Sequence, residues 1–331
     1  MSKFIKTLVG ILGIGAAIYW SVLGVEFDDV MESFGDADIL LIGAVLVMTS
    51  LNLIVRAAVW KAIVRPMKNV SLLNALATYL IGVFSNLFLP FKLGDVAQGY
   101  SLGRRTEISK ISLVTAVLVQ RVFEVTSLML IMVLIATLFS FPLLFERQTV
   151  ILGLGVIAAI VVLMLLVLHR ERVVKWLEYL LKRFSPTTAA AVKRTFELFI
   201  EGTGAIQSFS DIVRVLGLSI VSWGIQITMV LLMARSLDIE ISFLNASIVL
   251  LAINIGLLIP IAPGNIGTFQ FFSILALSWF SVNKSKSLAF AILFQVIQGI
   301  PVIFGGGLSM IIEVFSSKTV KMNAKNTKNY S

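Results

Sequence analysis

The sequence predicts an all-α polytopic membrane protein with two inverted-topology repeats, each with about three transmembrane helices and a re-entrant broken helix. Three observations lead to this prediction. Hydrophobic residues make up 58% of the 331 residues, and charged residues only 14%. Basic residues gather in a few loops and at the C-terminal end. A motif rich in proline and glycine interrupts an apolar stretch twice, about half the chain apart.

The low share of charged residues indicates an integral membrane protein, because soluble globular chains carry about 25% charged residues. The apolar segments are long and helical in pattern, unlike the short alternating strands of outer-membrane barrels. The net charge of +9 does not indicate nucleic-acid binding, since the basic residues lie where they set membrane topology. The absence of cysteine excludes a disulfide framework and a thiolate metal site.

Six apolar segments are long enough to cross a bilayer, which takes about twenty residues. The first follows Lys3 and Lys6 and has no small-residue cleavage site, so we expect a retained helix and not a signal peptide. In chain order, the predicted crossings are Phe4–Val25, Ile39–Trp60, Ile111–Phe141, Thr149–Leu168, Ile212–Arg235 and Leu288–Val314.

Two further apolar stretches, Ser71–Pro90 and Phe243–Trp279, are predicted to enter and leave the membrane on one side. Loops rich in Lys and Arg stay in the cytoplasm, and such loops flank the first stretch on both sides. The same rule places both chain ends in the cytoplasm and the acidic loop Glu26–Asp38 outside. It also leaves Lys284 and Lys286 outside, against the general trend.

These assignments predict one integral membrane domain over residues 1–315 and a basic cytoplasmic tail over residues 316–331. Repeat A covers about residues 1–141 and repeat B about residues 149–315. A cytoplasmic amphipathic connector is predicted over residues 169–211, lying on the lipid headgroups. We expect the protein in a prokaryotic cytoplasmic (inner) membrane.

The two interrupted stretches share the motif P-x-x-x-G-[DN]-[VI], as LPFKLGDV and as IPIAPGNI. Their prolines are 170 positions apart (260 minus 90), and the same shift aligns the flanking crossings. Proline breaks a helix and glycine permits a turn. We expect Asp95 and Asn265 to cap the helices that follow. The predicted helix-breaking residues are Pro90, Gly94, Pro260, Pro263 and Gly264.

Inverted repeats with broken helices in corresponding positions are typical of transporters, whose binding site lies near the membrane midplane. The N–H groups at the start of a helix favour anions. The two breaks are therefore predicted to form a polar cavity for a substrate. Arg104 and Arg105, in the basic loop after the first break, are expected to anchor the topology or contact headgroups.

Ionisable residues within a membrane are costly and are candidates for function. Lys92 and Arg121 are predicted to bind a phosphate, Lys as a point charge and Arg as a fork. Arg56 is expected to add to this pocket. Asp95 and Glu124 are expected to balance the charge, contact a cationic headgroup or carry a proton. Further substrate-binding candidates are Asn86, Gln98, Asn265, Thr268 and Gln270.

A structural interpretation of the same residues stays open. Arg121 and Glu124 are three positions apart on a helix and can pair, and Lys92 and Asp95 can satisfy each other at a rim. Amides of the second half can join helices by hydrogen bonds. The run Gly305–Gly307 is expected to allow close helix packing.

The sequence contains no signature of an enzyme. There is no nucleotide-binding glycine loop and no Ser/His/Asp set, and the single histidine excludes a paired-histidine metal site. The two carboxylates assigned to the membrane interior, Asp95 and Glu124, are too few for a metal site. No catalytic residue, metal ligand or cofactor is expected.

Three stretches carry a resemblance to a known family: FLPFKLGDVAQGYSLGRRTEIS, VLVQRVFEV and IPIAPGNIGTFQ. In this order they resemble the membrane region of lysylphosphatidylglycerol synthases, whose stand-alone relatives are described as flippase-like membrane proteins. The resemblance covers essentially the whole chain. The soluble aminoacyl-transferase domain of the fused enzymes is not found in this sequence, so synthesis of lysyl-lipid is not expected.

The chain departs from the family at several polar positions. Family members often have Arg, Glu and Arg where this chain has Lys92, Asp95 and Gln98, and often Glu and Asp at Gln120 and Glu124. The sign of the charge is kept at Lys92, Asp95 and Glu124 and lost at the two glutamines. The resemblance therefore does not imply an identical headgroup.

These observations predict a lipid flippase or transporter that moves a phosphate-bearing lipid, either a phospholipid or a polyprenyl-phosphate-linked lipid, across the inner membrane. The expected partners are membrane lipids with an anionic or phosphate-bearing headgroup, and no nucleic acid. A separate lipid-modifying enzyme is a further candidate partner, and the oligomeric state is not indicated. Two alternatives stay open: an accessory protein or enzyme of lipid-linked glycan or aminoacyl-lipid metabolism, and a transporter of small solutes or ions.

Overall fold

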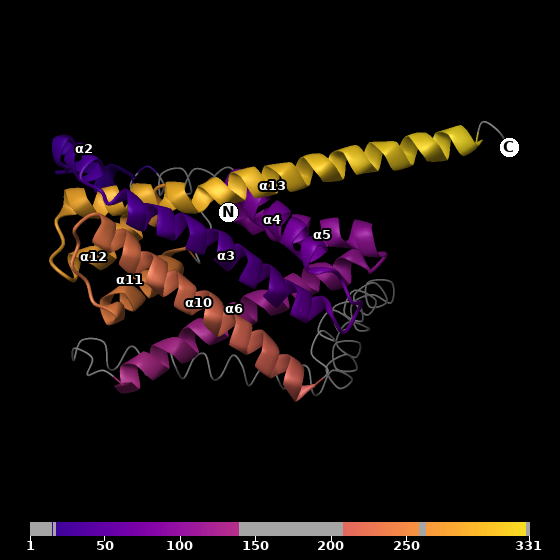
Figure 1. Cartoon of the computed structure of the whole chain (residues 1–331), viewed down its shortest axis with the longest axis horizontal. Coiled ribbons are helices and arrows are strands. Elements are labelled where there is room, and N and C mark those ends of the chain that lie inside the picture. The colour runs from indigo at the N-terminus through magenta and orange to yellow at the C-terminus, as the bar shows by residue number, and fades with distance from the viewer. Residues whose placement is uncertain (1–14, 16–17, 139–207, 258–262, 329–331) are drawn as a thin grey trace, which may run out of the picture.

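The computed structural model describes residues 15, 18–138, 208–257 and 263–328, and every regular element among them is a helix. In chain order these are α2 (Phe27–Gly35), α3 (Ile39–Val64), α4 (Leu72–Phe88), α5 (Leu93–Thr106), α6 (Lys110–Leu138), α10 (Phe209–Ser236), α11 (Phe243–Gly256), α12 (Thr268–Ser278) and α13 (Lys284–Lys328), with short 3-10 turns η1 (Pro90–Lys92) and η2 (Pro263–Asn265) (Figure 1).

Helices α3, α6, α10 and α13 each contain a segment long and apolar enough to cross a membrane. They correspond to the predicted crossings Ile39–Trp60, Ile111–Phe141, Ile212–Arg235 and Leu288–Val314. Together with the shorter apolar helices they confirm the prediction of an all-helical membrane protein. The crossing Thr149–Leu168, residues 169–207 of the connector, Pro260 and the start of the first crossing lie outside the described residues.

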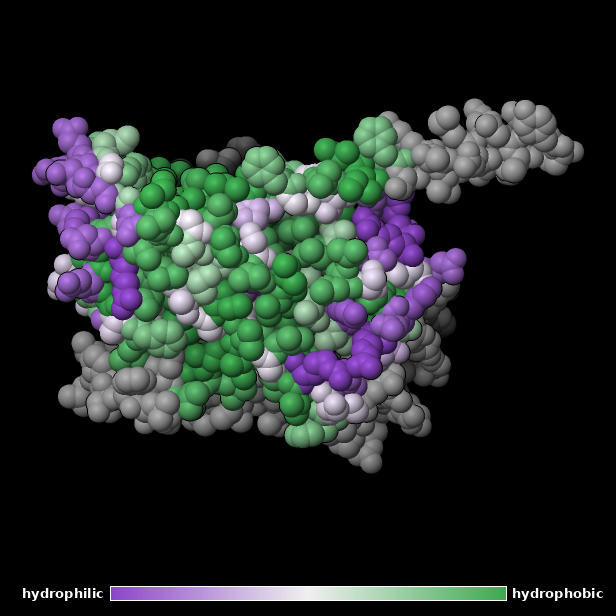
Figure 2. All heavy atoms as spheres, viewed as in Figure 1, coloured by the Kyte–Doolittle hydropathy of each residue, from purple (hydrophilic) through white to green (hydrophobic). Residues whose placement is uncertain are grey.

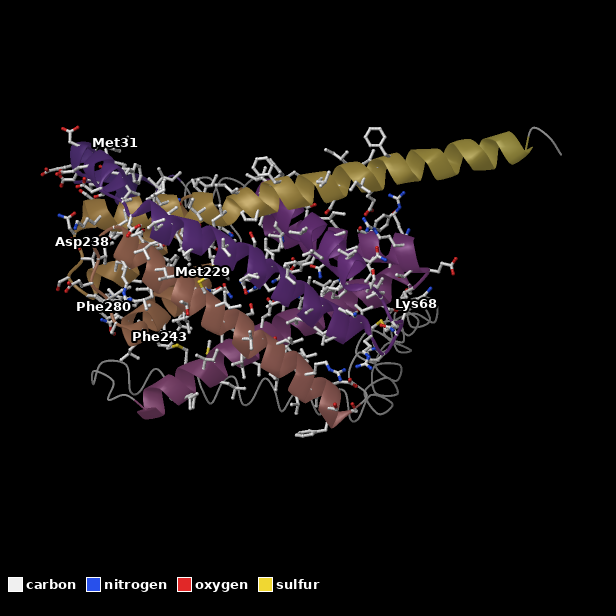
Figure 3. The ribbon with its side chains drawn as sticks, in the orientation of Figure 1. Met31, Lys68, Met229, Asp238, Phe243 and Phe280 are labelled. Atoms are coloured by element: carbon white, nitrogen blue, oxygen red, sulfur yellow. The ribbon has the colours of Figure 1, made fainter. Side chains whose placement is uncertain are left out.

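Hydrophobic side chains form a broad band across the middle of the molecule, and hydrophilic side chains lie at its two ends (Figure 2). Figure 3 places Met31, Asp238 and Phe280 at one end and Lys68 at the other. The first end also carries Asp28 and Asp29 of α2, and the second carries Arg104 and Arg105 of α5. We call them the acidic end and the basic end.

Helices α3 and α10 are the antiparallel pair at the centre of the molecule. Asp38 begins α3 by accepting hydrogen bonds from the next backbone N–H groups, and its own N–H donates to the Ser236 carbonyl at 2.9 Å. In the middle of the pair, the buried Ser222 hydroxyl donates to Asn52 Oδ1 at 2.8 Å. These two contacts fix the register of α3 against α10.

The first interrupted stretch is a helical hairpin, which we call hairpin A: α4, η1 and α5. Its tip turns through Phe91 (φ 58°) and Lys92 (φ 54°), both left-handed. The two arms lie very close together, because a Cβ on Gly94 would fall 2.1 Å from the Gly82 carbonyl oxygen. Glycine is therefore required where the arms touch, and the helix is interrupted at the tip, directly before α5 begins at Leu93.

The second interrupted stretch is hairpin B: α11, η2 and α12. Gly264 adopts φ 62° at its tip, and Gly256 lies against the ring of Phe272, where a Cβ would be 2.1 Å from the nearest ring carbon. The two tips meet, since η2 contacts both η1 and α4. A Cβ on Gly264 would lie 3.3 Å from the Leu87 carbonyl oxygen. The inverted relation between the halves remains a prediction.

The expectation that Asp95 caps α5 is wrong. The N-cap position is Lys92, whose side chain makes no capping hydrogen bond, and Asp95 lies in the first turn of α5. Asn86 takes over this role from α4, because its Oδ1 accepts a hydrogen bond from the Gly94 N–H at 2.8 Å. The left-handed turn at the tip moves the start of the helix away from Asp95.

The expectation that Asn265 caps α12 is also wrong. Asn265 is itself left-handed (φ 59°) within η2, and α12 begins after Gly267. The Gly267 N–H donates to Gln270 Oε1 at 2.7 Å, so a side chain of the first turn folds back onto the helix start.

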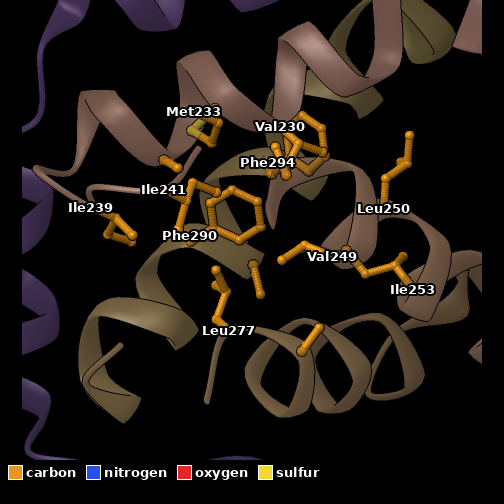
Figure 4. Close-up of a cluster of buried hydrophobic side chains, with 14 of the residues drawn as sticks. Val230, Met233, Ile239, Ile241, Val249, Leu250, Ile253, Leu277, Phe290 and Phe294 are labelled. Carbon is orange, nitrogen blue, oxygen red and sulfur yellow. The ribbon is translucent and has the colours of Figure 1, made fainter. Parts of the chain in front are cut away.

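Buried hydrophobic side chains form two clusters, one in each half of the molecule. The first surrounds α3 to α6 and includes Trp60 and Leu102. The second surrounds α10 to α13, where Phe290 and Phe294 pack against Met233 and Leu277 (Figure 4). Most members of each cluster come from one half of the chain, although Val215 and Val302 join the first cluster and Val30, Val45 and Leu128 join the second.

Helix α13 runs without a break from Lys284 to Lys328, past residue 315 where the membrane domain was predicted to end. Its glycine run packs on α4, since a Cβ on Gly306 would lie 2.4 Å from Phe84 Cβ. The predicted role of Gly305–Gly307 in close packing is therefore confirmed. Pro301 lies inside the helix.

The two lysines that the charge rule left outside have local partners at the acidic end. Lys284 Nζ donates to the carbonyls of Trp20 and Leu23 at 2.6 and 2.7 Å. Lys286 Nζ lies 3.7 Å from Asp238. Lys284 therefore stabilises the carbonyls at the end of a helix, and Lys286 stabilises the Asp238 carboxylate. These contacts account for the two lysines in this loop.

Candidate functional site

A network of ion pairs lies beside the tip of hairpin A. Arg121 on α6 binds Asp95 with two hydrogen bonds, from Nε to Oδ2 at 2.9 Å and from Nη2 to Oδ1 at 2.7 Å. Its third contact, from Nη1, goes to Glu124 Oε2 at 2.7 Å. The planar fork of an arginine suits this bidentate geometry. The pair predicted between Arg121 and Glu124 is confirmed.

Glu124 joins this network to the central helix pair. Its Oε1 accepts from Arg56 Nη1 on α3 at 3.2 Å and from Gln120 Nε2 at 3.0 Å. The Arg56 guanidinium also stacks on Trp223 of α10, 5.3 Å from the ring centroid, and the Trp223 indole N–H donates to the Glu124 carbonyl at 2.8 Å. Arg56 therefore belongs to the same network of contacts.

Three amides complete the network. Asn86 Nδ2 on α4 donates to Asp95 Oδ1 at 3.0 Å, and Gln98 Nε2 on α5 donates to Gln120 Oε1 at 3.1 Å. The network thus links α3, α4, α5 and α6. It fixes the tip of hairpin A against the crossing helices.

The four charged groups of the network balance one another, with two arginines and two carboxylates. The side chain of Arg121 is the most open, at 30% exposed, against 15% for Asp95 and 11% for Glu124. A partly buried ion pair is stabilising only while each charge keeps its partners, so the network is sensitive to the loss of any member.

Lys92 differs from its neighbours. Its side chain makes no hydrogen bond or ion pair with any residue in the described part of the chain, although its charge interacts with Arg121, Asp95 and Glu124. The alternative in which Lys92 pairs with Asp95 is not observed, because Asp95 binds Arg121 and Asn86. Lys92 adds one positive charge to a network that is otherwise neutral.

The second half has amides where the first has charges. Gln270 Nε2 donates to Gln295 Oε1 at 2.5 Å, and Gln295 Nε2 donates to the Gly264 carbonyl at 2.8 Å. Thr268 is buried in the first turn of α12, and Asn265 forms part of the tip. The residues 170 positions after Arg121 and Glu124 are Ala291 and Phe294, both in the hydrophobic core. The charged site therefore belongs to one half.

Sequence reasoning missed a third carboxylate. Glu313 lies near the end of the predicted crossing Leu288–Val314, yet only Asp95 and Glu124 were assigned to the membrane interior. It accepts a hydrogen bond from Arg105 Nη2 at 2.9 Å and another from the Ser101 hydroxyl. A single acid on an otherwise apolar helix was the available signal. Arg105 is therefore more than a topology anchor.

No group of three or more His, Cys, Asp or Glu side chains that could hold a metal occurs among the described residues. Lys92 and the partly exposed Arg121 are cationic hydrogen-bond donors, which are the groups that pair with oxyanions in proteins.

A family model described as the lysylphosphatidylglycerol synthase TM region matches residues 7–306 of the chain. No curated protein and no solved structure matches the chain.

Proposed function

The chain belongs to the lysylphosphatidylglycerol synthase TM region family, and on this premise we propose that it translocates a phosphate-bearing lipid across the cytoplasmic (inner) membrane. Membership of this family indicates a membrane function related to lipids. The substrate is a phospholipid or a polyprenyl-phosphate-linked lipid, and its phosphate group binds at the tip of hairpin A.

The observation that carries this proposal is that Lys92 has no partner among the described residues, although its charge interacts with that of the partly exposed Arg121. An ionisable group in a membrane interior is costly unless it has a partner or a task. Arg121 has protein partners, and Lys92 has none among the described residues. A phosphate between the two would supply the missing partner.

The phosphate binds first to Lys92 and then competes with Asp95 for the fork of Arg121. Asp95 keeps a hydrogen bond from Asn86 when it leaves Arg121, and Glu124 keeps one from Arg56. No carboxylate is then left without a donor, so the exchange costs less than breaking an isolated buried pair. The two hairpin tips, which touch, form the barrier that the headgroup must pass.

We place the basic end of the molecule and both chain ends in the cytoplasm, because Lys and Arg in short loops remain on that side. Hairpin A then opens toward the cytoplasm and hairpin B toward the outside. Such a pair of broken helices about a shared midplane site is the arrangement of an alternating-access transporter.

The experiment is native mass spectrometry of the gently extracted protein, with identification of the lipids that remain bound. Lys92→Gln removes the free charge without breaking an ion pair, and Lys286→Gln is the matched control at the acidic end. We expect a stoichiometric phosphate-bearing lipid that is lost in Lys92→Gln and kept in Lys286→Gln. Equal lipid retention in both variants, or bulk lipid only, would contradict the proposal and favour a transporter of solutes or ions.

A further inference from the structure

A second polar cluster lies near the basic end, where α5 meets α13. Arg105 Nη2 and the Ser101 hydroxyl donate hydrogen bonds to the same oxygen, Glu313 Oε2. On its other side, Arg105 Nη1 points to Asn74 Oδ1 at 3.5 Å. Two donors from one helix thus converge on one oxygen of a carboxylate supplied by another helix.

The two donors form a built site for an anion. Ser101 is 2% exposed, and the Arg105 side chain is 23% exposed. Partial burial strengthens charge-assisted hydrogen bonds, and arginine suits the oxygens of a carboxylate and of a phosphate equally. The Glu313 carboxylate occupies the place that a phosphate oxygen can take.

Helix α5 holds its two donors firmly in place. A Cβ on Gly99 would fall 2.8 Å from the Val114 backbone nitrogen of α6, so α5 and α6 touch along their backbones. The glycine at position 94 brings α5 even closer to α4, where a Cβ would fall 2.1 Å from the Gly82 carbonyl oxygen. Arg105 and Ser101 therefore stay in position whether or not Glu313 is bound to them.

Helix α13, which supplies Glu313, carries a proline within its length. Pro301 lies inside this helix, twelve positions (313 minus 301) before Glu313. A proline lacks the N–H that would bind the carbonyl four residues earlier, at Ile297, so the helix bends there at lower cost.

We propose that Arg105 and Ser101 form an entry site for the phosphate group of the lipid, and that Glu313 fills this site as an internal carboxylate until the phosphate displaces it. The site rests on the proposed function, as the step before the headgroup reaches hairpin A. Arg105 and Asp95 are ten positions (105 minus 95) apart on one helix, which is about 15 Å along its axis. A headgroup at Arg105 is therefore one short step from the network.

The test measures the binding of a short-chain phosphatidic acid to the detergent-solubilised full chain, with a diacylglycerol of equal chain length as the phosphate-free probe. Glu313→Gln removes the competing charge and keeps a similar shape, so we expect it to raise the affinity for phosphatidic acid about fivefold or more. The diacylglycerol should bind equally to both proteins. The double variant Arg105→Gln/Glu313→Gln should lose the gain.

A purely structural ion pair gives a different result. Breaking it with Glu313→Gln would leave the affinity unchanged or lower it, and either outcome overturns the proposal, as does a gain that survives in the double variant. Asp211→Asn, which removes a carboxylate from an ion pair with Arg214 within α10, is the matched control and should change nothing. Thermal unfolding of each variant checks that it is folded.

Two further comparisons distinguish a lipid phosphate from free phosphate, and distinguish failure of the entry site from failure of the proposed function. Inorganic phosphate is titrated alone. Arg105-dependent binding of inorganic phosphate without binding of phosphatidic acid would overturn the lipid entry site. The assay needs no translocation, so a wild-type protein that moves no lipid would contradict the proposed function while the Arg105 and Glu313 result stands separately.

Discussion

At the scale of single residues, Arg121 and Lys92 have different parts in the network. Arg121 is held by two carboxylates, so it organises the site, whereas Lys92 has no partner among the described residues, which is why the proposed function assigns it the first contact with the phosphate. The sequence predicted both as phosphate ligands. Only the structure shows that Arg121 is already bound to two carboxylates, whereas Lys92 has no partner among the described residues.

The loss of Arg121 should destabilise the protein strongly. Arg121→Ala leaves Asp95 and Glu124 each without their shortest contact, and removing one partner of a buried pair costs about 3–5 kcal/mol. The double variant Asp95→Ala/Arg121→Ala should lose less than the sum of the single variants, with a coupling of about 1 kcal/mol or more. Reversible unfolding in mixed detergent measures all three free energies, and strictly additive losses would show that the pair contributes nothing.

Residue spacing predicted part of this site. Arg121 and Glu124 are three positions apart on a continuous helix, where such pairs meet, and they do pair. Lys92 and Asp95 have the same spacing, but Lys92 is left-handed and lies before the helix, so the rule does not apply to them. The contact of Arg105 with Glu313, 208 positions away, has no local signal in the sequence.

At the scale of elements, the broken helices were predicted from proline and glycine alone, since these residues act on the backbone locally. The ends of the helices were predicted less well. Asp95 and Asn265 were expected to be caps, yet Asn86 from another helix and Gln270 from the first turn take these roles. A cap supplied from a different element depends on packing, which the local sequence does not encode.

The packing of α13 on hairpin A depends on Gly306 more than on its neighbour Gly307. Gly306→Ala places a methyl group 2.4 Å from Phe84 Cβ, so the helices must separate, at about 1–3 kcal/mol. Gly307→Ala is the matched control, because its Cβ meets only the far edge of the same ring at 3.9 Å. Both gain similar helix propensity. Thermal unfolding should show a lower midpoint for Gly306→Ala alone, and equal midpoints would contradict the close approach.

At the scale of the whole molecule, each hydrophobic cluster draws mainly on one half of the chain, while the charged network beside hairpin A lies entirely in the first half. Composition and loop charge predicted the membrane class and the helices that span it. The shift of 170 positions also places uncharged residues, Ala291 and Phe294, opposite Arg121 and Glu124. What the sequence could not give is the set of contacts that joins Arg56, Asp95, Arg121 and Glu124 into one network, because these residues come from different helices.

The placement of hairpin A in the membrane can be tested with single cysteines, because the chain has none of its own. We expect Asn69→Cys and Lys110→Cys, on either side of hairpin A, to react with a membrane-impermeant thiol reagent from the cytoplasmic side only. Glu32→Cys, in α2 at the acidic end, should react from the outside only. Labelling of the first two positions from opposite sides would mean a full crossing and would overturn the re-entrant assignment.

In the proposed function the free charge of Lys92 serves lipid translocation, and this role is tested most directly by the movement of a fluorescent phospholipid between leaflets of liposomes that contain the purified protein. We predict that wild type and Lys286→Gln move the lipid, and that Lys92→Gln moves it about tenfold more slowly, because it loses one charge-assisted contact of about 1.5 kcal/mol. Translocation by Lys92→Gln at the wild-type rate, or no movement above protein-free liposomes in any sample, would contradict the account.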